Sequence, residues 1–266
     1  MRKDKKIIYY DDPTSDDFAG TNINAGKIDE SYPYIRRGIL FRVCSFLLYY
    51  VLALPLVWFF ERVLLRVRFV NKRAMRGYHA TPVFLFGNHT GFYDAYTPSI
   101  ISAPRRNSVV VSPDAVSVKG LGCVVQMLGA IPVPTTYRAM GSFTEAIDYH
   151  HKSRNITIYP EAHIWPYYTG VRPFPDTSFT YAVKHGSPVF AFFTAYTEPK
   201  GFLKFLRKAN MTVYVSDPII PDESLPPHEA RRDLRDRVYS FMKEKSALST
   251  YNVYEYIMRE KESAEV

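Results

Sequence analysis

The stretch Val83-Phe84-Leu85-Phe86-Gly87-Asn88-His89-Thr90-Gly91-Phe92-Tyr93-Asp94 joins an apolar run to a short polar loop. Four consecutive apolar residues followed by a glycine are typical of a buried strand. The residues that follow, from about 92 to 101, form a helix candidate. A strand that leads through a loop into a helix is the building unit of an α/β sheet. The stretch therefore predicts the fold class, with His89 in the loop and Asp94 in the first turn of the helix.

The same alternation continues on both sides of this stretch. Strand-like runs are found at about 65–69, 83–86, 108–111, 130–133, 156–159, 188–194 and 211–215. Helix candidates lie at about 92–101, 116–128, 140–151, 179–185 and 228–245. This order predicts an α/β fold: a single domain with a mixed, partly parallel sheet of about seven strands, covered by helices on both faces.

Charge is unevenly distributed along the 266 residues, which hold 34 Lys and Arg against 26 Asp and Glu. Residues 36–76 contain nine basic residues and one acidic residue, and they enclose residues 43–60, which carry no charge. We therefore divide the chain into an irregular N-terminal arm (1–35), an apolar, membrane-associating helical element with basic flanks (36–64) and an α/β domain (65–266). All of the predicted strands lie within residues 65–266.

The basic flanks suit the phosphates of an anionic membrane surface, where each basic residue contributes roughly 1 kcal/mol. Nucleic acid is the competing partner of a basic patch, but the patch brackets an apolar run and no nucleic-acid-binding motif accompanies it, so we expect none. A membrane crossing needs about 20 apolar residues, and Pro55 is expected to kink a straight helix. We favour a helix, or a broken helical pair, embedded in one leaflet over a single crossing; a buried core helix is the third alternative.

The two cysteines form no disulfide framework, which indicates a reducing compartment and a catalytic domain that faces the cytoplasm.

His89 and Asp94 are the sharpest candidates for catalysis. The Asp94 carboxylate can fold back to accept the Nδ1–H of His89, which leaves Nε2 free to take a proton as a general base. A second pair with the same spacing, His228 and Asp233, lies within the predicted C-terminal helix. Five helical positions turn through about 500°, so those side chains lie about 140° apart and cannot form the same contact. The competing interpretation of the first pair is a turn in which Asn88 and Asp94 only cap the backbone.

A second polar cluster, Tyr159-Pro160-Glu161-Ala162-His163-Ile164-Trp165-Pro166, follows another predicted strand. A carboxylate and an imidazole at a strand end suit a polar pocket of an α/β protein. Arg172 lies shortly after this cluster, and a guanidinium is the natural bidentate partner of a phosphate. A proline-rich surface loop is the alternative.

Four blocks of the sequence together resemble the glycerolipid acyltransferases, specifically the 1-acylglycerol-3-phosphate (lysophosphatidic acid) O-acyltransferase group. The first is Asn88-His89, four residues and Asp94. The others follow in the order of that family: Leu128-Gly129-Ala130-Ile131-Pro132-Val133, then Tyr159-Pro160-Glu161, then Ser187-Pro188-Val189-Phe190. The resemblance covers about residues 65–200, and the apolar N-terminal element with its basic flanks also suits the family.

The resemblance implies a membrane-associated enzyme that moves an acyl chain from acyl-CoA or acyl-carrier protein to the hydroxyl of a lysophospholipid. The first expected acceptor is 1-acylglycerol-3-phosphate, which gives phosphatidic acid; another lysophospholipid or a polyol is the alternative. His89 and Asp94 are then catalytic, and Glu161 positions the acceptor. The full expected set of substrate-binding residues is Asn88, Glu161, His163, Arg172, Arg138 and Lys119. The implied chemistry requires no metal, no further cofactor and no covalent intermediate.

The chain departs from the family pattern at two arginines. The third block usually reads Phe-Pro-Glu-Gly-Thr-Arg, but here Ile164 stands where the arginine implied to hold the acceptor's phosphate is expected. The arginine that closes the second block would fall at Thr135. We expect Arg172, with Arg138 or Lys119, to replace that phosphate contact.

Three rival functions are considered. A serine hydrolase needs a G-x-S-x-G elbow, which the chain lacks. A nucleotide-binding enzyme needs a complete glycine loop, and Gly120-Leu121-Gly122 lacks the third glycine. A non-catalytic lipid-binding protein stays possible because of the altered third block, although the presence of both His89 and Asp94 argues against it. A Cys123 nucleophile is less favoured because a lone cysteine in an apolar run is usually a core residue.

Overall fold

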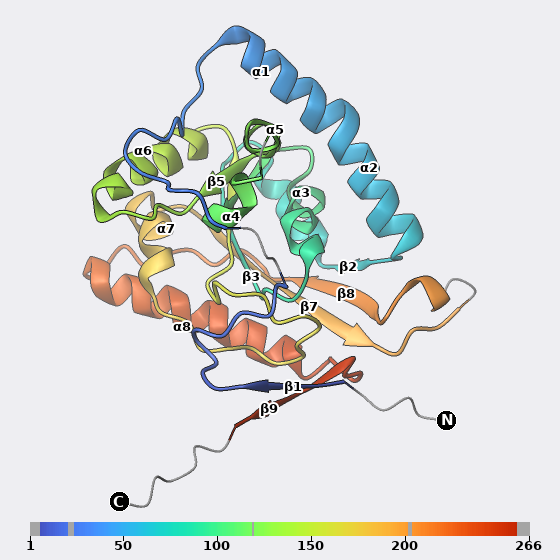
Figure 1. The fold of residues 1–266 in the computed structure, drawn as a ribbon. Coiled ribbons are helices and arrows are strands. Elements are labelled where there is room, and N and C mark those ends of the chain that lie inside the picture. Colours follow the sequence, from blue (N-terminus) through green and yellow to red (C-terminus); the bar gives the residue numbers. More distant parts are fainter. Residues whose placement is uncertain (1–5, 21–23, 119, 202–203, 260–266) are drawn as a thin grey trace, which may run out of the picture.

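The computed structural model describes residues 6–20, 24–118, 120–201 and 204–259. Its centre is a seven-stranded sheet in the order β2-β8-β7-β3-β6-β4-β5 (Figure 1). The strands are β2 (Arg68–Val70), β3 (Phe84–Gly87), β4 (Asn107–Val111), β5 (Ala130–Pro132), β6 (Asn155–Ile158), β7 (Val189–Thr197) and β8 (Asn210–Val215). Only the β7–β8 pair is antiparallel, and the other strand pairs of this sheet are parallel. The mixed, partly parallel sheet is therefore confirmed.

Helices cover both faces of this sheet. They are η3 (Lys72–Tyr78), η4 (Phe92–Ala95), α3 (Thr97–Ser102), α4 (Pro113–Val116), α5 (Gly122–Leu128), η5 (Tyr137–Ala139), α6 (Met140–His151), η6 (Thr177–Phe179), α7 (Thr180–Lys184), η7 (Lys204–Leu206) and α8 (Pro227–Ser246). Successive residues of a strand point to opposite faces. Phe84 and Phe86 accordingly join the core formed with α6, α7 and α8. Leu85 points the other way, into the core formed with η3 and α3.

Two predicted helices are each divided in the structure. The candidate at 92–101 is the 3-10 helix η4 followed by α3, and Pro98 lies in the first turn of α3. A proline suits that position because its missing N–H would have no partner there. The candidate at 116–128 is represented by α4, which ends at Val116, and α5, which begins at Gly122. The helix at 140–151 has the predicted bounds as α6.

The apolar N-terminal element is one continuous helical run, not a broken pair. It comprises α1 (Ile39–Phe46), the π-helical η1 (Leu47–Ala53), α2 (Leu54–Phe59) and the π-helical η2 (Phe60–Leu64). Pro55 lies in the first turn of α2, directly after η1. Because the wide turn of a π-helix changes the hydrogen-bond register, the run can accommodate a residue that lacks an N–H.

This helix leaves most of its apolar surface uncovered. By length and composition, Ile39–Leu64 is the one helix among the described residues that is long and apolar enough to cross a membrane, and only 11% of its apolar window is buried. A buried core helix, the third alternative from the sequence, is thereby contradicted. The exposed apolar side chains are Ile39, Leu40, Val43, Phe46, Leu47, Val51, Leu52, Leu56, Trp58, Phe59 and Val63.

The N-terminal arm contains a strand, so the expectation that it is irregular is wrong for that part. β1 (Lys6–Tyr10) pairs in parallel with β9 (Tyr254–Met258) in a separate two-stranded sheet. Figure 1 shows this small sheet on the side of the molecule away from α1. In the other described parts of the arm, residues 11–20 and 24–35, the structure has no helix or strand, and Ile28 and Tyr34 lie in the core. The pairing joins residues too far apart in sequence for a local pattern to show it.

Candidate active site

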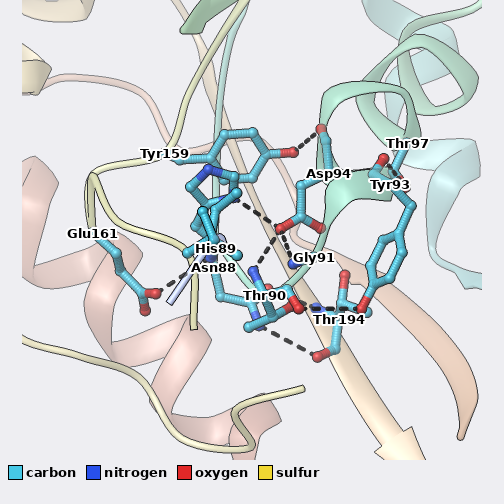
Figure 2. A network of polar contacts seen from close by, with 12 residues as sticks. Asn88, His89, Thr90, Gly91, Tyr93, Asp94, Thr97, Tyr159, Glu161 and Thr194 are labelled. Carbon is cyan, nitrogen blue, oxygen red and sulfur yellow. Dashed lines mark hydrogen bonds and ion pairs between the residues drawn. The ribbon is translucent and has the colours of Figure 1, made fainter. Parts of the chain in front are cut away.

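His89 and Asp94 form the predicted contact. β3 ends at Gly87, and the loop after it places His89 Nδ1 2.9 Å from Asp94 Oδ2 (Figure 2). The same carboxylate oxygen accepts the backbone N–H groups of Thr90 and Gly91. Because Oδ2 acts as an acceptor for all three groups, Nδ1 carries a proton, and in the neutral imidazole Nε2 keeps its lone pair. Asp94 therefore caps the turn and orients the imidazole at once.

The imidazole of His89 is fixed on one face and open at an edge. Its ring stacks on Tyr159 with ring centroids 4.4 Å apart, and its side chain is 18% exposed, against 1% for Asp94. The backbone N–H of His89 donates to Glu161 Oε2 over 3.3 Å, and its carbonyl accepts from the N–H of Trp165 over 3.1 Å. The loop after β6 thus holds the His89 loop from both sides.

Three buried tyrosines contact the loop that carries His89. Tyr159 donates its hydroxyl to the backbone carbonyl of Asp94, and the hydroxyl of Tyr196 contacts Thr90 Oγ1 and the hydroxyl of Tyr93. Burial raises the pKa of Tyr93, Tyr159 and Tyr196 well above the ordinary value. These phenols consequently remain neutral, and they serve as hydrogen-bonding supports.

Asn88 lies away from solvent, contrary to its expected contact with substrate. Its Oδ1 accepts the backbone N–H of Thr194 over 2.8 Å, and its Nδ2 donates to the carbonyl of Thr194 over 3.3 Å (Figure 2). The side-chain amide thereby continues the pairing of β3 with β7 by one further residue. Asn88 is fully buried, so its contribution to the site is to fix the start of the loop.

Glu161 and Arg172 form a buried ion pair beneath the loop. Arg172 Nη2 lies 3.1 Å from Glu161 Oε2, and the backbone N–H of Arg172 donates to Oε1 over 3.1 Å. The side chain of Glu161 is 0% exposed and that of Arg172 is 1% exposed. Burial raises the pKa of the Glu161 carboxyl, while the Arg172 guanidinium and the backbone N–H groups of Arg172 and His89 oppose that rise. In this arrangement the guanidinium faces Glu161 and the carbonyl of His163, not a phosphate at the surface.

The other expected substrate-binding residues have different surroundings. His163 is partly exposed, with Nδ1 3.7 Å from Asp17 Oδ2. Arg138 is exposed on η5, beyond the carboxyl end of β5, the same edge of the sheet at which His89 lies. Lys119 lies outside the described residues. His163 and Arg138 are therefore the described members of the expected substrate-binding set with accessible side chains.

The two positions where family arginines are replaced both contact the N-terminal arm. Thr135 Oγ1 accepts the N–H of Ile28 over 3.0 Å and donates to the carbonyl of the same residue. The N–H of Ile164 donates to Asp17 Oδ1 over 3.1 Å, and its carbonyl accepts from the N–H of Phe18. The arm thus contacts both positions, although Thr135 remains exposed, and it brings the acidic side chain of Asp17 to Ile164.

The arm also fixes the loop that carries Glu161, which the sequence did not reveal. The indole N–H of Trp165 donates to the carbonyl of Asp16 over 2.7 Å. The ring of Trp165 is fully buried and stacks on Tyr256 of β9, with ring centroids 4.9 Å apart, and Tyr10 of β1 lies against it. In the sequence, Trp165 is only one aromatic residue in a proline-rich segment. Its partners lie near the two ends of the chain, so no local signal identified it.

An apolar cavity of about 330 Å³ adjoins the segment that carries Asp94. It extends from η4 to the end of the N-terminal helical run and to the segment before β8. Its lining residues are Phe60, Leu64, Leu65, Phe92, Tyr93, Tyr167, Leu206, Arg207, Lys208, Ala209 and Met211. Within the described ranges, no group of three His, Cys, Asp or Glu side chains is placed to hold a metal ion.

The fold is similar to that of a solved acyltransferase. The crystal structure of the 1-acyl-sn-glycerophosphate (LPA) acyltransferase PlsC from Thermotoga maritima matches with a TM-score of 0.53 and 16% sequence identity, over 81% of this chain and 90% of that chain. No protein-family model matches the chain, and no curated protein matches it in sequence. At this level of identity the likeness shows a shared fold, the α/β fold expected from the sequence.

Proposed function

We propose that the protein is a membrane-associated acyltransferase that moves an acyl chain from an acyl thioester to the free hydroxyl of a lysophospholipid. The observation that carries the proposal is the His89–Asp94 pair, with its Nδ1–H···Oδ2 contact of 2.9 Å and its open imidazole edge. The likeness in fold to a solved acyltransferase supports the same chemistry.

In the proposed reaction, His89 Nε2 takes the proton of the acceptor hydroxyl as its oxygen attacks the thioester carbonyl. Asp94 stabilises the imidazolium that forms. The tetrahedral intermediate then collapses, the carbon–sulfur bond breaks, and the thiolate takes the proton back from His89. The acyl ester and the free thiol are the products, and His89 is regenerated without a covalent enzyme intermediate. The reaction as proposed uses acyl-CoA or acyl-carrier protein as co-substrate and no other cofactor.

Residues around the pair act as positioning groups in this proposal. Glu161 holds the backbone N–H of His89, and Arg172 holds Glu161. The apolar cavity beside Phe92 and Tyr93 suits an acyl chain, because its lining is mostly aliphatic and aromatic. The uncovered side of Ile39–Leu64 suits contact with the membrane in which a lysophospholipid resides, and we propose that the helix lies in one leaflet with the catalytic domain facing the cytoplasm.

The first acceptor to test is 1-acylglycerol-3-phosphate, for which Arg138 and His163 are the accessible candidates to contact the headgroup. A different lysophospholipid or a polyol is the second candidate. It is favoured by one observation: Thr135 and Ile164, which stand where the family pattern has arginines, both contact the arm, and the acidic side chain of Asp17 lies at Ile164. A non-catalytic lipid-binding role is the remaining alternative.

The test is acyl transfer from labelled acyl-CoA and acyl-carrier protein to lysophosphatidate, other lysophospholipids and glycerol, in detergent and in vesicles. Wild type, His89→Ala and His228→Ala are measured side by side. His228 is a matched control because it has the same spacing to an aspartate but lies exposed on α8. We expect transfer by wild type and by His228→Ala, and none by His89→Ala. Folded wild-type protein that transfers to no acceptor would overturn the proposal in favour of lipid binding without catalysis.

A further inference from the structure

A second cavity, of about 720 Å³, lies at the opposite edge of the sheet from His89. Arg106 and Arg154 line it, and they directly precede β4 and β6, so they stand at the amino ends of strands that run parallel to β3. Strands of four or five residues separate the two edges by roughly 13–17 Å. α1 forms a wall of the cavity and lies beside α5 (Figure 1). The cavity is therefore distinct from the candidate active site.

The charges that line this cavity all have one sign. Its lining includes Arg36, Arg42, Arg106 and Arg154 but no aspartate or glutamate. Within the part of the chain that the structure describes, none of these four arginines forms an ion pair. Arg36 and Arg42 are exposed, whereas Arg106 and Arg154 are half-buried. Because charge that is partly removed from water without a partner is unfavourable, an anion from outside the chain would stabilise the two half-buried arginines.

Two of the arginines are held in place by neutral groups. Arg106 Nη2 donates to Ser45 Oγ over 2.7 Å and to the carbonyl of Met127, and its guanidinium lies 4.8 Å from the centre of the Tyr49 ring. Arg106 Nε is buried and has no hydrogen-bond partner among the described residues. Arg154 Nη1 donates to Ser108 Oγ over 3.3 Å. These contacts orient the guanidinium groups but leave their charge uncompensated.

The two guanidinium groups are close enough to influence one another. Burial, with Arg106 as the next cause, lowers the pKa of Arg154 to about 10. Burial also lowers the pKa of Arg106. Arg154 still carries its charge near pH 7, and an arginine remains protonated under ordinary conditions. A pair of planar donors with two positive charges matches the oxygens of a phosphate group.

The wall of the cavity indicates that the phosphate belongs to a lipid. Ile39, Val43 and Phe46 of α1 and Leu47 of η1 line the cavity and also belong to the exposed apolar side of the helical run. A ligand with its phosphate on Arg106 and Arg154 can therefore extend apolar chains along α1 without leaving apolar surroundings. A free phosphate ion would bind the arginines but would make no favourable contact with the apolar wall of the cavity.

We propose that the cavity between α1, α6 and the amino ends of β4 and β6 is a binding site for the phosphate group of an anionic membrane lipid, with Arg106 and Arg154 as its anchors. Occupancy of this site docks the N-terminal helix on a membrane that contains such lipids. The site does not depend on acyl transfer, and it goes beyond a general attraction of the basic flanks to an anionic surface.

The test compares binding of the full-length protein to vesicles of phosphatidylcholine with binding to vesicles that contain one-fifth phosphatidylglycerol. Arg106→Gln/Arg154→Gln is compared with Arg37→Gln/Arg68→Gln, which removes the same charge from two exposed arginines outside the cavity. We expect the cavity pair to lose at least tenfold more affinity for the anionic vesicles than the control pair. Equal losses would show a general electrostatic effect and overturn the proposal.

A second variant keeps the test valid if loss of the Arg106 contacts unfolds the protein. Ser153 lines the cavity, is exposed and makes no side-chain hydrogen bond within the described residues, so Ser153→Glu brings a carboxylate to the arginines without removing a contact. We expect this variant to fold and to lose binding to anionic vesicles. In a parallel arm, short-chain phosphatidylglycerol is expected to raise the unfolding temperature of wild type but not of Ser153→Glu. An equal rise with inorganic phosphate would identify a free anion as the occupant and overturn the assignment to a lipid.

Discussion

The two edges of the sheet differ in how their charges are balanced. At the carboxyl edge, Asp94 accepts three N–H groups through one oxygen, and Glu161 is paired with Arg172. At the amino edge, Arg106 and Arg154 face a cavity that has no carboxylate in its lining. The carboxylates of the first edge thus have hydrogen-bond or ion-pair partners within the chain, whereas the half-buried arginines of the second edge have no carboxylate partner among the described residues, which is why we propose a ligand there. The carboxyl edge therefore fixes the orientation of the His89 imidazole, whereas the amino edge offers positive charge to an anion.

The largest expected effect tests whether the carboxyl edge is organised for catalysis. Asp94→Asn keeps an oxygen that can cap the backbone N–H groups of Thr90 and Gly91, but it removes the charge that stabilises an imidazolium at His89. We expect acyl transfer to fall about 10²–10⁴-fold while the fold is kept. Steady-state kinetics and circular dichroism measure the two effects, with Asp233→Asn on α8 as the matched control. A loss of less than tenfold would show that Asp94 serves only as a cap.

The next effect tests whether the Glu161–Arg172 pair completes that edge. Glu161→Gln leaves the Arg172 guanidinium buried without its counter-charge, so we expect the free energy of unfolding to fall by about 3–5 kcal/mol. Denaturant unfolding in detergent measures it. Asp148→Asn is the control, because it weakens the partly exposed contacts of Asp148 with Lys184 and His185, for which about 1 kcal/mol or less per pair is expected. Equal losses in the two variants would contradict the idea that the buried pair fixes the loop.

A smaller effect concerns the pH dependence of the amino edge. Burial lowers the pKa of His151 to about 4, from an ordinary value of 6.5. The unfolded chain then binds a proton at higher pH than the folded chain, so stability is lost as the pH falls from about 6.5 toward 4. At pH 5 the loss expected from His151 alone, relative to pH 8, is about 2 kcal/mol, and His150, whose pKa burial lowers to about 3, adds a loss of similar size. Unfolding measured from pH 5 to 8 is expected to depend less on pH in His151→Gln than in wild type. Parallel curves would show that another group determines the dependence.

The smallest effect lies in the loop beneath His89. Ala162 has a φ angle of +63°, in the left-handed region that a glycine adopts without strain. Because a glycine also loses more chain entropy on folding, we expect Ala162→Gly to raise the free energy of unfolding by only about 0.5–1 kcal/mol. Thermal unfolding tests this against Ala115→Gly in α4, where a helical residue is replaced and a loss of similar size is expected. A loss at both positions would contradict strain at Ala162.

Local signals identified much of the carboxyl edge from the sequence. The apolar run before Gly87, the spacing from His89 to Asp94 and the helix at 140–151 each depend on residues that are near neighbours in the chain. The strand–helix order then fixed the class of the fold, and a strand's carboxyl end is where such folds place polar groups. These features depend on contacts between near neighbours in the chain, so the periodicity and the spacing of residues are enough to predict them.

Features that join distant segments of the chain could not be predicted from local sequence signals. Arg172 was expected at a phosphate because a guanidinium after a polar cluster has that chemistry, but its buried partner, Glu161, became evident only when the loop was folded. The pairing of β1 with β9 and the meeting of Arg106 with Arg154 depend on the strand order. No period or spacing in one sequence encodes which strand ends lie side by side.

The pairing of β1 with β9 has a consequence for the order of events during synthesis. The two strands lie 248 positions apart in the chain, so β1 leaves the ribosome long before its partner exists. At 5–20 residues per second, the arm waits roughly 12–50 seconds for β9. Trp165, which lies between these strands and the His89 loop, lacks its stacking partner Tyr256 during that interval. The nascent chain thus completes the support of its His89 loop only when residue 258 has been made, and a chain that stops earlier lacks that support.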